Sequence, residues 1–192
     1  MKKTILLIIS FVLIKSLFAE LRFYREDINF TLTDSTFTVD GLYFLRNDSD
    51  KDFKQALIYP FPQDSLYGLV DTIFCENMSR PDSAGVVRWN QRNATLQTSI
   101  PAHDSTVLRV YYSHTLLGGK AEYILETTSA WGKGFEQAYY DLTFPKTITI
   151  DSLSYMPDEL EETETHYKLI WIKKDFMPMK NFVVEFDVKR SP

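Results

Sequence analysis

The histidines and their neighbours are the first residues in this sequence that could do chemistry. His103, Asp104 and Ser105 are the residue types of a hydrolytic triad, but adjacent residues of a strand point to opposite faces, so their adjacency argues against one. His103, His114 and His166 could converge in a fold, yet we expect surface histidines on strands. No nucleophile elbow, phosphate-binding glycine loop, zinc-protease motif or dinucleotide fingerprint occurs. We therefore predict no catalytic residue and no enzymatic activity.

Two acidic segments could bind a cation. Residues 48–52 (DSDKD) alternate acids as a calcium loop does, but Phe53 and Tyr59 stand where the EF-hand pattern needs Gly and Glu. We interpret this segment as a solvated hairpin turn, and the acidic residues 158–164 (DELEETE) as a solvated loop. Cys75 is the only cysteine, which leaves no zinc pattern, and we expect it to be a small buried residue. We predict no metal site and no cofactor.

Aromatic side chains are the remaining candidates for binding. The chain has 14 Phe, 11 Tyr and 3 Trp, and the tryptophans could form a flat platform on which sugars stack, or could fill the core. Trp171 lies in an apolar run and is expected in the core. Trp131 lies in a predicted loop that Phe135 follows. The candidate contacts for a ligand or partner are Trp131, Phe135 and Trp89.

Strands must position these residues, because alternation of apolar and polar residues dominates the chain. The predicted strands cover residues 27–33, 36–45, 54–59, 69–75, 86–89, 94–100, 105–112, 122–127, 138–144, 147–151, 168–172 and 182–188. Turn-forming residues separate them, and residues 156–165 carry at most one helical turn. We predict an all-β antiparallel sandwich of about a dozen strands. Residues 20–192 form one domain in this prediction; the alternative is two small sandwiches divided near residues 118–119.

The N-terminus has the features of a secretory signal peptide. A basic start is followed by the apolar run 4–14 (TILLIISFVLI) and by small residues before Glu20. The run reaches only about 16 Å as a helix, too short to span a bilayer. We predict cleavage after Ala19 and export to the periplasm or outside a bacterial cell, with no stable transmembrane anchor.

Charge excludes one class of partner. The full chain has a formal charge of -5, and loss of residues 1–19 removes three lysines and no acid. A net negative chain of this kind disfavours nucleic acid as a partner. Four glycosylation sequons occur, at Asn29, Asn47, Asn77 and Asn93. In a eukaryotic secreted protein they would be glycan acceptors on surface loops, whereas in the bacterial export that we predict they have no meaning.

One stretch of the chain resembles a family of exported bacterial proteins of unknown function. The matching segments are 45–47 (LRN), 49–52 (SDKD), 59–62 (YPFP) and 123–131 (YILETTSAW). The chain departs from the family pattern at Leu45, where the family has an aromatic residue. It departs again at residues 59–61, where this chain has Tyr-Pro-Phe and the family has Phe-Pro-Leu. The resemblance implies a strand–turn–strand signature and transfers no catalytic residue.

Three hypotheses for function follow. The first is a non-catalytic binding or envelope-structural module with an unknown protein or envelope partner. The second is a carbohydrate-binding module that uses exposed aromatic residues on a polysaccharide. The third is a small hydrolase on a sandwich scaffold. An exposed coplanar aromatic pair would favour the second, and a cleft with two close carboxylates, or a histidine and a carboxylate, would favour the third.

Overall fold

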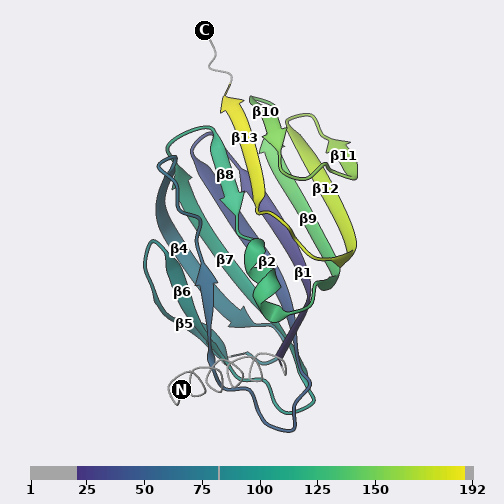
Figure 1. Cartoon of the computed structure of the whole chain (residues 1–192). Coiled ribbons are helices and arrows are strands. Elements are labelled where there is room, and N and C mark those ends of the chain that lie inside the picture. The colour runs from purple at the N-terminus through teal and green to yellow at the C-terminus, as the bar shows by residue number, and fades with distance from the viewer. Residues whose placement is uncertain (1–20, 82, 189–192) are drawn as a thin grey trace, which may run out of the picture.

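The protein is an all-β sandwich of thirteen strands and one 3₁₀ helix, in a computed structural model that describes residues 21–81 and 83–188 (Figure 1). This confirms the predicted fold class, while the predicted signal peptide lies outside the described residues. The elements are β1 (Leu21–Leu32), β2 (Thr36–Asn47), β3 (Ala56–Pro60), β4 (Tyr67–Asn77), β5 (Ala84–Trp89), β6 (Asn93–Thr98), β7 (Ser105–Leu116), β8 (Lys120–Tyr123), η1 (Glu126–Trp131), β9 (Phe135–Pro145), β10 (Ile148–Leu153), β11 (Glu159–Glu162), β12 (His166–Phe176) and β13 (Phe182–Val188). No helix in this part of the chain is long and apolar enough to cross a membrane.

A large seven-stranded sheet forms one layer of the sandwich. Its strand order is β11-β12-β9-β1-β2-β7-β4. All its neighbouring strands are antiparallel except β1 and β9, which run parallel at its centre. The large sheet therefore contains strands from both sides of residues 118–119 in the sequence, because β9 pairs directly with β1.

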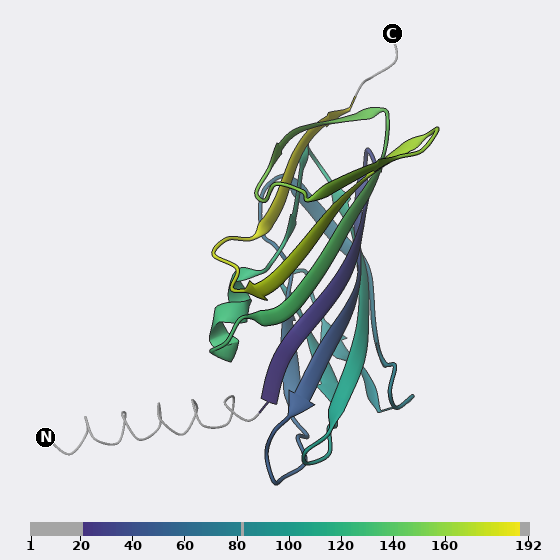
Figure 2. The ribbon, with the colours of Figure 1, turned by 90° about the vertical axis from the view of Figure 1, so that its right-hand side faces the viewer.

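Two three-stranded sheets form the other layer, in the orders β10-β13-β8 and β3-β6-β5. In Figure 2, which is turned by 90° from Figure 1, β10 and β13 lie to one side of β12, β9 and β1 of the large sheet. Phe30 of β1 contacts Tyr123 of β8, and Tyr43 of β2 contacts Tyr59 of β3, so both small sheets pack on the same face. The small sheets do not hydrogen-bond to each other. Residues of β3 and β6 on one side, and of β8 and η1 on the other, line the space between them.

Alternation of side chains builds the core between the layers. In β2 every second residue is buried, including Phe37, Val39 and Tyr43, and β7 follows the same pattern. Trp171 is fully buried, as its sequence context predicts, and Cys75 is buried. Burial raises the pKa of the Cys75 thiol to about 11, which keeps it protonated and unreactive at neutral pH.

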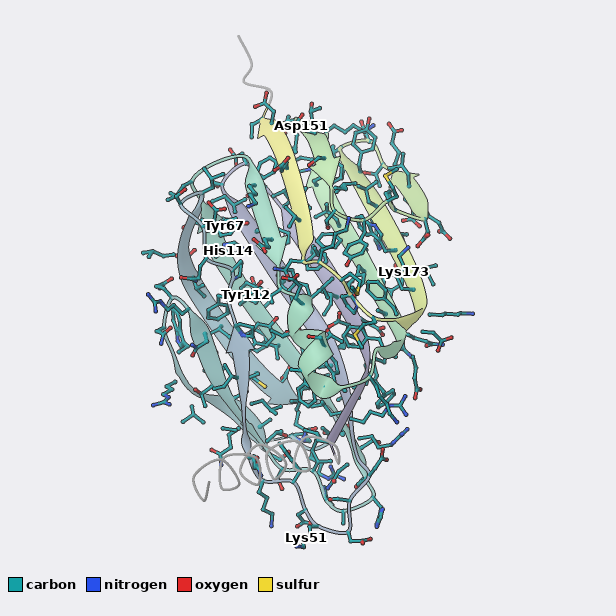
Figure 3. All side chains as sticks on the ribbon, in the orientation of Figure 1. Lys51, Tyr67, Tyr112, His114, Asp151 and Lys173 are labelled. Atoms are coloured by element: carbon teal, nitrogen blue, oxygen red, sulfur yellow. The ribbon has the colours of Figure 1, made fainter. Side chains whose placement is uncertain are left out.

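Three expectations about local structure were wrong. Residues 159–162 form β11, an exposed strand that pairs with β12, where the sequence predicts a solvated loop. Residues 126–131 form η1, where it predicts a strand end and a loop. His114 is buried, where it predicts a surface histidine. Figure 3 shows His114 between Tyr67 and Tyr112, and its ring also meets Phe37 edge-on at 5.7 Å.

Buried asparagines order the loops at one end of the sandwich. Asn47 Nδ2 donates to the carbonyls of Lys51, Ile100 and Pro101, and its Oδ1 accepts from Ser49. These contacts hold residues 48–52 in the loop that leads from β2 in the large sheet to β3 in a small sheet. The predicted hairpin turn is also wrong, because β2 and β3 do not pair with each other.

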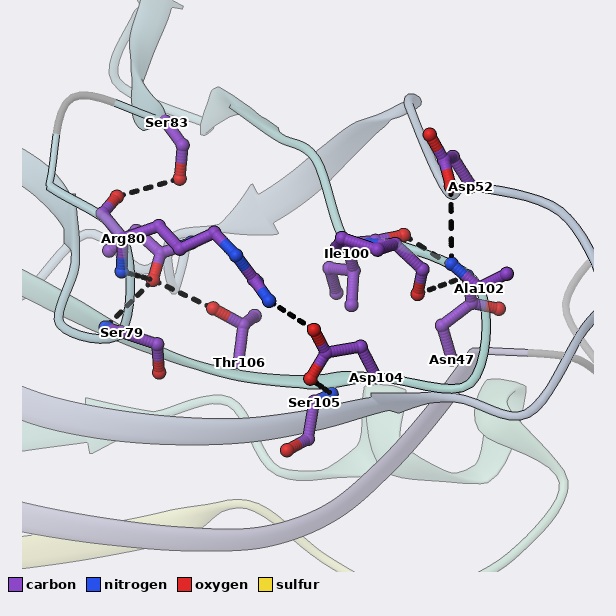
Figure 4. A network of polar contacts seen from close by, with 12 residues as sticks. Asn47, Asp52, Ser79, Arg80, Ser83, Ile100, Ala102, Asp104, Ser105 and Thr106 are labelled. Carbon is purple, nitrogen blue, oxygen red and sulfur yellow. Dashed lines mark hydrogen bonds and ion pairs between the residues drawn. The ribbon is translucent and has the colours of Figure 1, made fainter.

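Asn77 plays the same part in the neighbouring loop, where its Oδ1 accepts from Ser79, Arg80 and Thr106 (Figure 4). Arg80 also forms an ion pair with Asp104. Because Asn47 and Asn77 are 1% and 2% exposed, their side chains cannot carry glycans in the folded protein.

Candidate functional site

A pocket enters the sandwich through the gap between the two small sheets. Its outer chamber, of about 360 Å³, lies between β3 and η1 and is lined by residues that include Ile58, Pro60, Ala130 and Trp131. An inner chamber of about 90 Å³ continues toward the large sheet. A single water needs ~10–15 Å³ by the same measure, so the inner chamber can hold a small organic group.

The inner lining comes from distant parts of the chain. The large sheet supplies Phe23, Glu26, Tyr43, Leu45, Leu108 and Val110, the small sheets supply Leu57, Ile58, Tyr59, Pro60, Leu96 and Tyr123, and residues 124–131 supply Ile124, Thr127, Thr128 and Trp131. Most of these side chains are aliphatic or aromatic. Glu26 is the single residue among them that carries a formal charge when ionised. A mainly apolar pocket with a few convergent polar groups is the usual form of a small-molecule site.

Glu26 is a carboxyl group buried at the inner end of this pocket. It is 1% exposed and projects from β1 on the same face as the core residues Ile28 and Phe30. Tyr140 Oη donates to Oε1 at 2.5 Å, and Tyr123 Oη donates to Oε2 at 3.1 Å. Loss of hydration on burial raises the pKa of Glu26 from 4.5 to about 7, although both tyrosine hydrogen bonds act to lower it.

Two further tyrosines extend the network toward the pocket. Tyr43 Oη lies 3.1 Å from Tyr123 Oη and 2.7 Å from Tyr59 Oη. A hydroxyl has one proton to donate. Since Tyr123 donates to Glu26, it accepts from Tyr43, and Tyr43 in turn accepts from Tyr59. When Glu26 is ionised, each hydroxyl in the order Tyr59, Tyr43, Tyr123 therefore donates its hydrogen bond toward the carboxylate. The Tyr59 oxygen is left as an acceptor.

The tyrosines stay neutral over the physiological range. Burial raises the pKa of Tyr43, Tyr59, Tyr123 and Tyr140 well above 10, and the nearby Glu26 carboxylate adds to each shift. Asp27, the next residue along β1, pairs instead with Arg25 at 2.6 Å. Glu26 is thus the one group of the network that titrates near neutral pH.

The predicted contact residues occupy three different environments. Trp131 ends η1, is half-buried and lines both chambers. Phe135 is 1% exposed and packs behind Phe23, whose ring in turn meets Trp131 at 5.9 Å. Trp89 is 41% exposed on β5 and lines neither chamber. The structure therefore brings Trp131 and Phe135 to the same wall and leaves Trp89 apart from it.

The three histidines do not come together. His103 is exposed in the loop after Pro101 and lies 2.8 Å from Asp50. His166 is exposed at the start of β12 and contacts Thr165. His114 is buried against aromatic rings, and its Nε2 has no hydrogen-bond partner among the described residues. Burial lowers the pKa of His114 to about 4, so the ring is neutral at physiological pH.

Sequence reasoning overlooks Glu26, although a signal was present. Along β1 the buried face carries Glu26, Ile28, Phe30 and Leu32, so an acidic residue stands in phase with three core positions. A charge at a core position indicates a buried, functional or paired group. The partner tyrosines could not be found in this way, since Tyr59, Tyr123 and Tyr140 lie on three other strands.

Comparisons with known proteins support the fold. No protein-family model and no curated protein matches the chain, so the resemblance to an exported family stays a prediction. A solved structure of a putative nutrient binding protein from Legionella pneumophila superposes with a TM-score of 0.61 at 13% identity, over 87% of this chain and 67% of that one.

A second similarity is to a mutant M1 zinc metallopeptidase from Deinococcus radiodurans, with a TM-score of 0.53 at 10% identity. The match covers 86% of this chain and 42% of the metallopeptidase, so the chain spans less than half of that protein. At these identities both similarities concern the fold.

Proposed function

We propose that this protein is a non-catalytic binding module that takes a small, mainly apolar molecule into the pocket between β3 and η1. The observation that carries the proposal is the two-chamber pocket itself, which leads from solvent to a buried Glu26–tyrosine network. An apolar body would fill the aliphatic and aromatic lining, and one polar group would reach Tyr59 or Glu26. The similarity to a Legionella protein described as nutrient binding is consistent with this role.

The lining supports binding rather than hydrolysis. General acid–base hydrolysis of a glycoside needs two carboxyl groups about 5–9.5 Å apart, and the pocket lining holds Glu26 alone. None of the three histidines lines either chamber. With the predicted signal peptide, the proposal places this binding in the periplasm or outside the cell.

The tryptophan indole N–H groups provide a test with internal controls. The protein would be labelled with ¹⁵N and titrated with 3,3-dimethylbutan-1-ol, benzyl alcohol and benzylamine. Binding in the pocket should move the Trp131 indole signal. The Trp171 indole donates to the Tyr155 carbonyl at 3.0 Å inside the core, and Trp89 lies away from the pocket, so both signals should stay in place.

A variant with a blocked pocket, compared with a control variant on the same helix, tests the same proposal. Ala130 is exposed and lines the outer chamber, so Ala130→Phe should fill the mouth and weaken binding of these probes at least about tenfold, a loss of about 1.4 kcal/mol. Ser129→Phe adds the same side chain to η1 at a neighbouring exposed residue that does not line the pocket, and should bind normally. The proposal is wrong if no probe moves the Trp131 signal, or if Ala130→Phe binds as the unaltered protein does.

A further inference from the structure

We infer that the ligand of this pocket is an organic ammonium ion, a cation whose nitrogen bears apolar substituents, recognised by Glu26 together with the aromatic rings around it. The inference rests on the proposed function, because it names the ligand class of the same pocket. Three observations carry it: the buried carboxyl group has no cationic partner, aromatic rings follow one another along the lining, and the remaining lining is apolar.

Glu26 is a buried acid without a counter-charge. None of the ion pairs among the described residues includes it, and no Lys, Arg or His lines either chamber. Its partners are two phenol hydroxyls, which occupy one site on each carboxylate oxygen. A carboxylate has about four acceptor sites, so acceptor capacity remains. Burying an unpaired charge is costly, and a bound cation would offset that cost.

Aromatic rings form a continuous wall beside the carboxyl group. Tyr59 meets Tyr43 at 5.8 Å and 88°, Tyr43 meets Phe23 at 5.7 Å and 39°, and Phe23 meets Trp131 at 5.9 Å and 70°. Tyr123 completes the lining near Glu26. Rings set at steep angles around a small space can present negative π-faces to a cation, which is how quaternary ammonium groups are recognised.

The rest of the lining selects the type of cation. Leu45, Leu57, Leu96, Leu108 and Val110 line the inner chamber and suit the apolar substituents of an organic ion. Ca²⁺ requires six to eight oxygen ligands and Mg²⁺ keeps several waters, which one carboxylate and three lining tyrosines in an apolar chamber do not provide. An anion would face the Glu26 carboxylate without any basic side chain.

Binding of such a cation should depend on the protonation of Glu26. The ionisable groups that face Glu26 are Tyr43 on β2, Tyr59 on β3, Tyr123 on β8 and Tyr140 on β9, and Asp27 acts on it along β1. η1 contributes two threonines and a tryptophan to the lining, and none of them titrates. The tyrosines remain neutral, so the raised pKa of Glu26, about 7, sets the pH range. Below that pKa a proton competes with the cation.

The experiment compares choline with 3,3-dimethylbutan-1-ol, which has the same shape and no charge. Affinities would be measured on the full chain from the Trp131 indole signal at pH 5.5, 6.5, 7.5 and 8.5. We expect choline to bind at least about tenfold more tightly than the alcohol at pH 8.5, and to lose nearly tenfold per pH unit below the pKa of Glu26. The alcohol should bind equally at all four pH values.

Glu26→Gln is the diagnostic variant, since it keeps a side-chain oxygen for a tyrosine and removes the charge. It should lose most of the preference for choline and all of its pH dependence; should it fail to fold, the pH profile of the unaltered protein decides. Equal binding of the two probes, or a preference for choline that Glu26→Gln leaves undiminished, would overturn the cation inference and leave the proposed function standing. Silence of the Trp131 signal with both these probes and benzyl alcohol would overturn both.

Discussion

At the scale of single residues, the buried side chains of Glu26 and His114 have opposite effects on stability. Glu26 has a pKa of about 7 in the folded protein against 4.5 ordinarily, so between these values the folded state holds a proton that the unfolded state has lost. The contribution of Glu26 to the free energy of unfolding therefore falls as pH rises from about 4.5 to about 7. His114 has a folded pKa of about 4 against 6.5, so stability from His114 rises as pH rises over about the same range.

These contributions should nearly cancel, and single variants should uncover each of them. Glu26→Gln should make the protein gain stability from pH 4 to 6.5, because Glu26 then no longer offsets the contribution of His114. His114→Phe should make it lose stability from pH 4.5 to 7. A pKa difference of one corresponds to about 1.4 kcal/mol. The free energy of unfolding of each variant should therefore change by on the order of 3 kcal/mol over its pH range. Urea unfolding at pH 4.5, 5.5, 6.5 and 7.5 measures both, and parallel curves for the two variants would contradict the assignment.

At the scale of elements, the turn between β7 and β8 is held by backbone contacts. Gly119 O accepts from Phe186 N of β13 at 2.9 Å, and a Cβ added at Gly119 would lie 2.1 Å from Phe186 O. A Cβ added at Gly118 would instead meet Leu66 Cδ2 at 2.9 Å, the end of a partly exposed, flexible side chain. The first contact cannot be relieved without moving β13, and the second can.

Alanine substitutions at these two glycines should therefore differ. Gly119→Ala should destabilise the protein by about 1–3 kcal/mol, as overpacking against fixed structure does, and Gly118→Ala by less than about 1 kcal/mol. Thermal or urea unfolding of the pair measures the difference. An equal effect of the two substitutions would mean that this turn moves freely relative to β13.

The alternation of apolar and polar residues predicts most of the strands correctly, because each of them buries one face. The sequence predicts residues 182–188 as a strand, and β13 covers them, since its apolar residues alternate throughout. β11 was not predicted because all four of its residues are exposed; it is a strand only through its pairing with β12. Likewise, the pocket depends on which strands become neighbours. Glu26 could be suspected from its phase along β1, but its contact with Tyr140 spans 114 residues of sequence, which no local pattern reports.

At the scale of the whole molecule, one continuous core joins the three sheets. The buried cluster includes Phe30 of the large sheet, Leu96 of β6 and Phe182 of β13. Phe30 and Phe182 stack at 4.6 Å, so side chains far apart in the sequence depend on each other.

We therefore expect a single cooperative unfolding transition, with calorimetric and van't Hoff enthalpies in agreement. The alternative of two sandwiches divided near residues 118–119 predicts two transitions. Scanning calorimetry, with near-ultraviolet circular dichroism as a second probe, distinguishes them. Transitions at different temperatures for the two probes would support the division.

The parallel pairing of β1 with β9 also sets the order of events when the protein folds. β1 is among the first structured segments to be synthesised, but one of its two neighbours in the sheet is more than a hundred residues later in the chain. Until β9 is available, β1 presents an open edge of hydrogen-bonding groups. Sheets that close through such distant contacts fold slowly, and exposed edges of this kind favour aggregation of incomplete chains. The hydrogen bond from Tyr140 of β9 to Glu26, which lies at the inner end of the pocket, can therefore form only after β9 has joined β1.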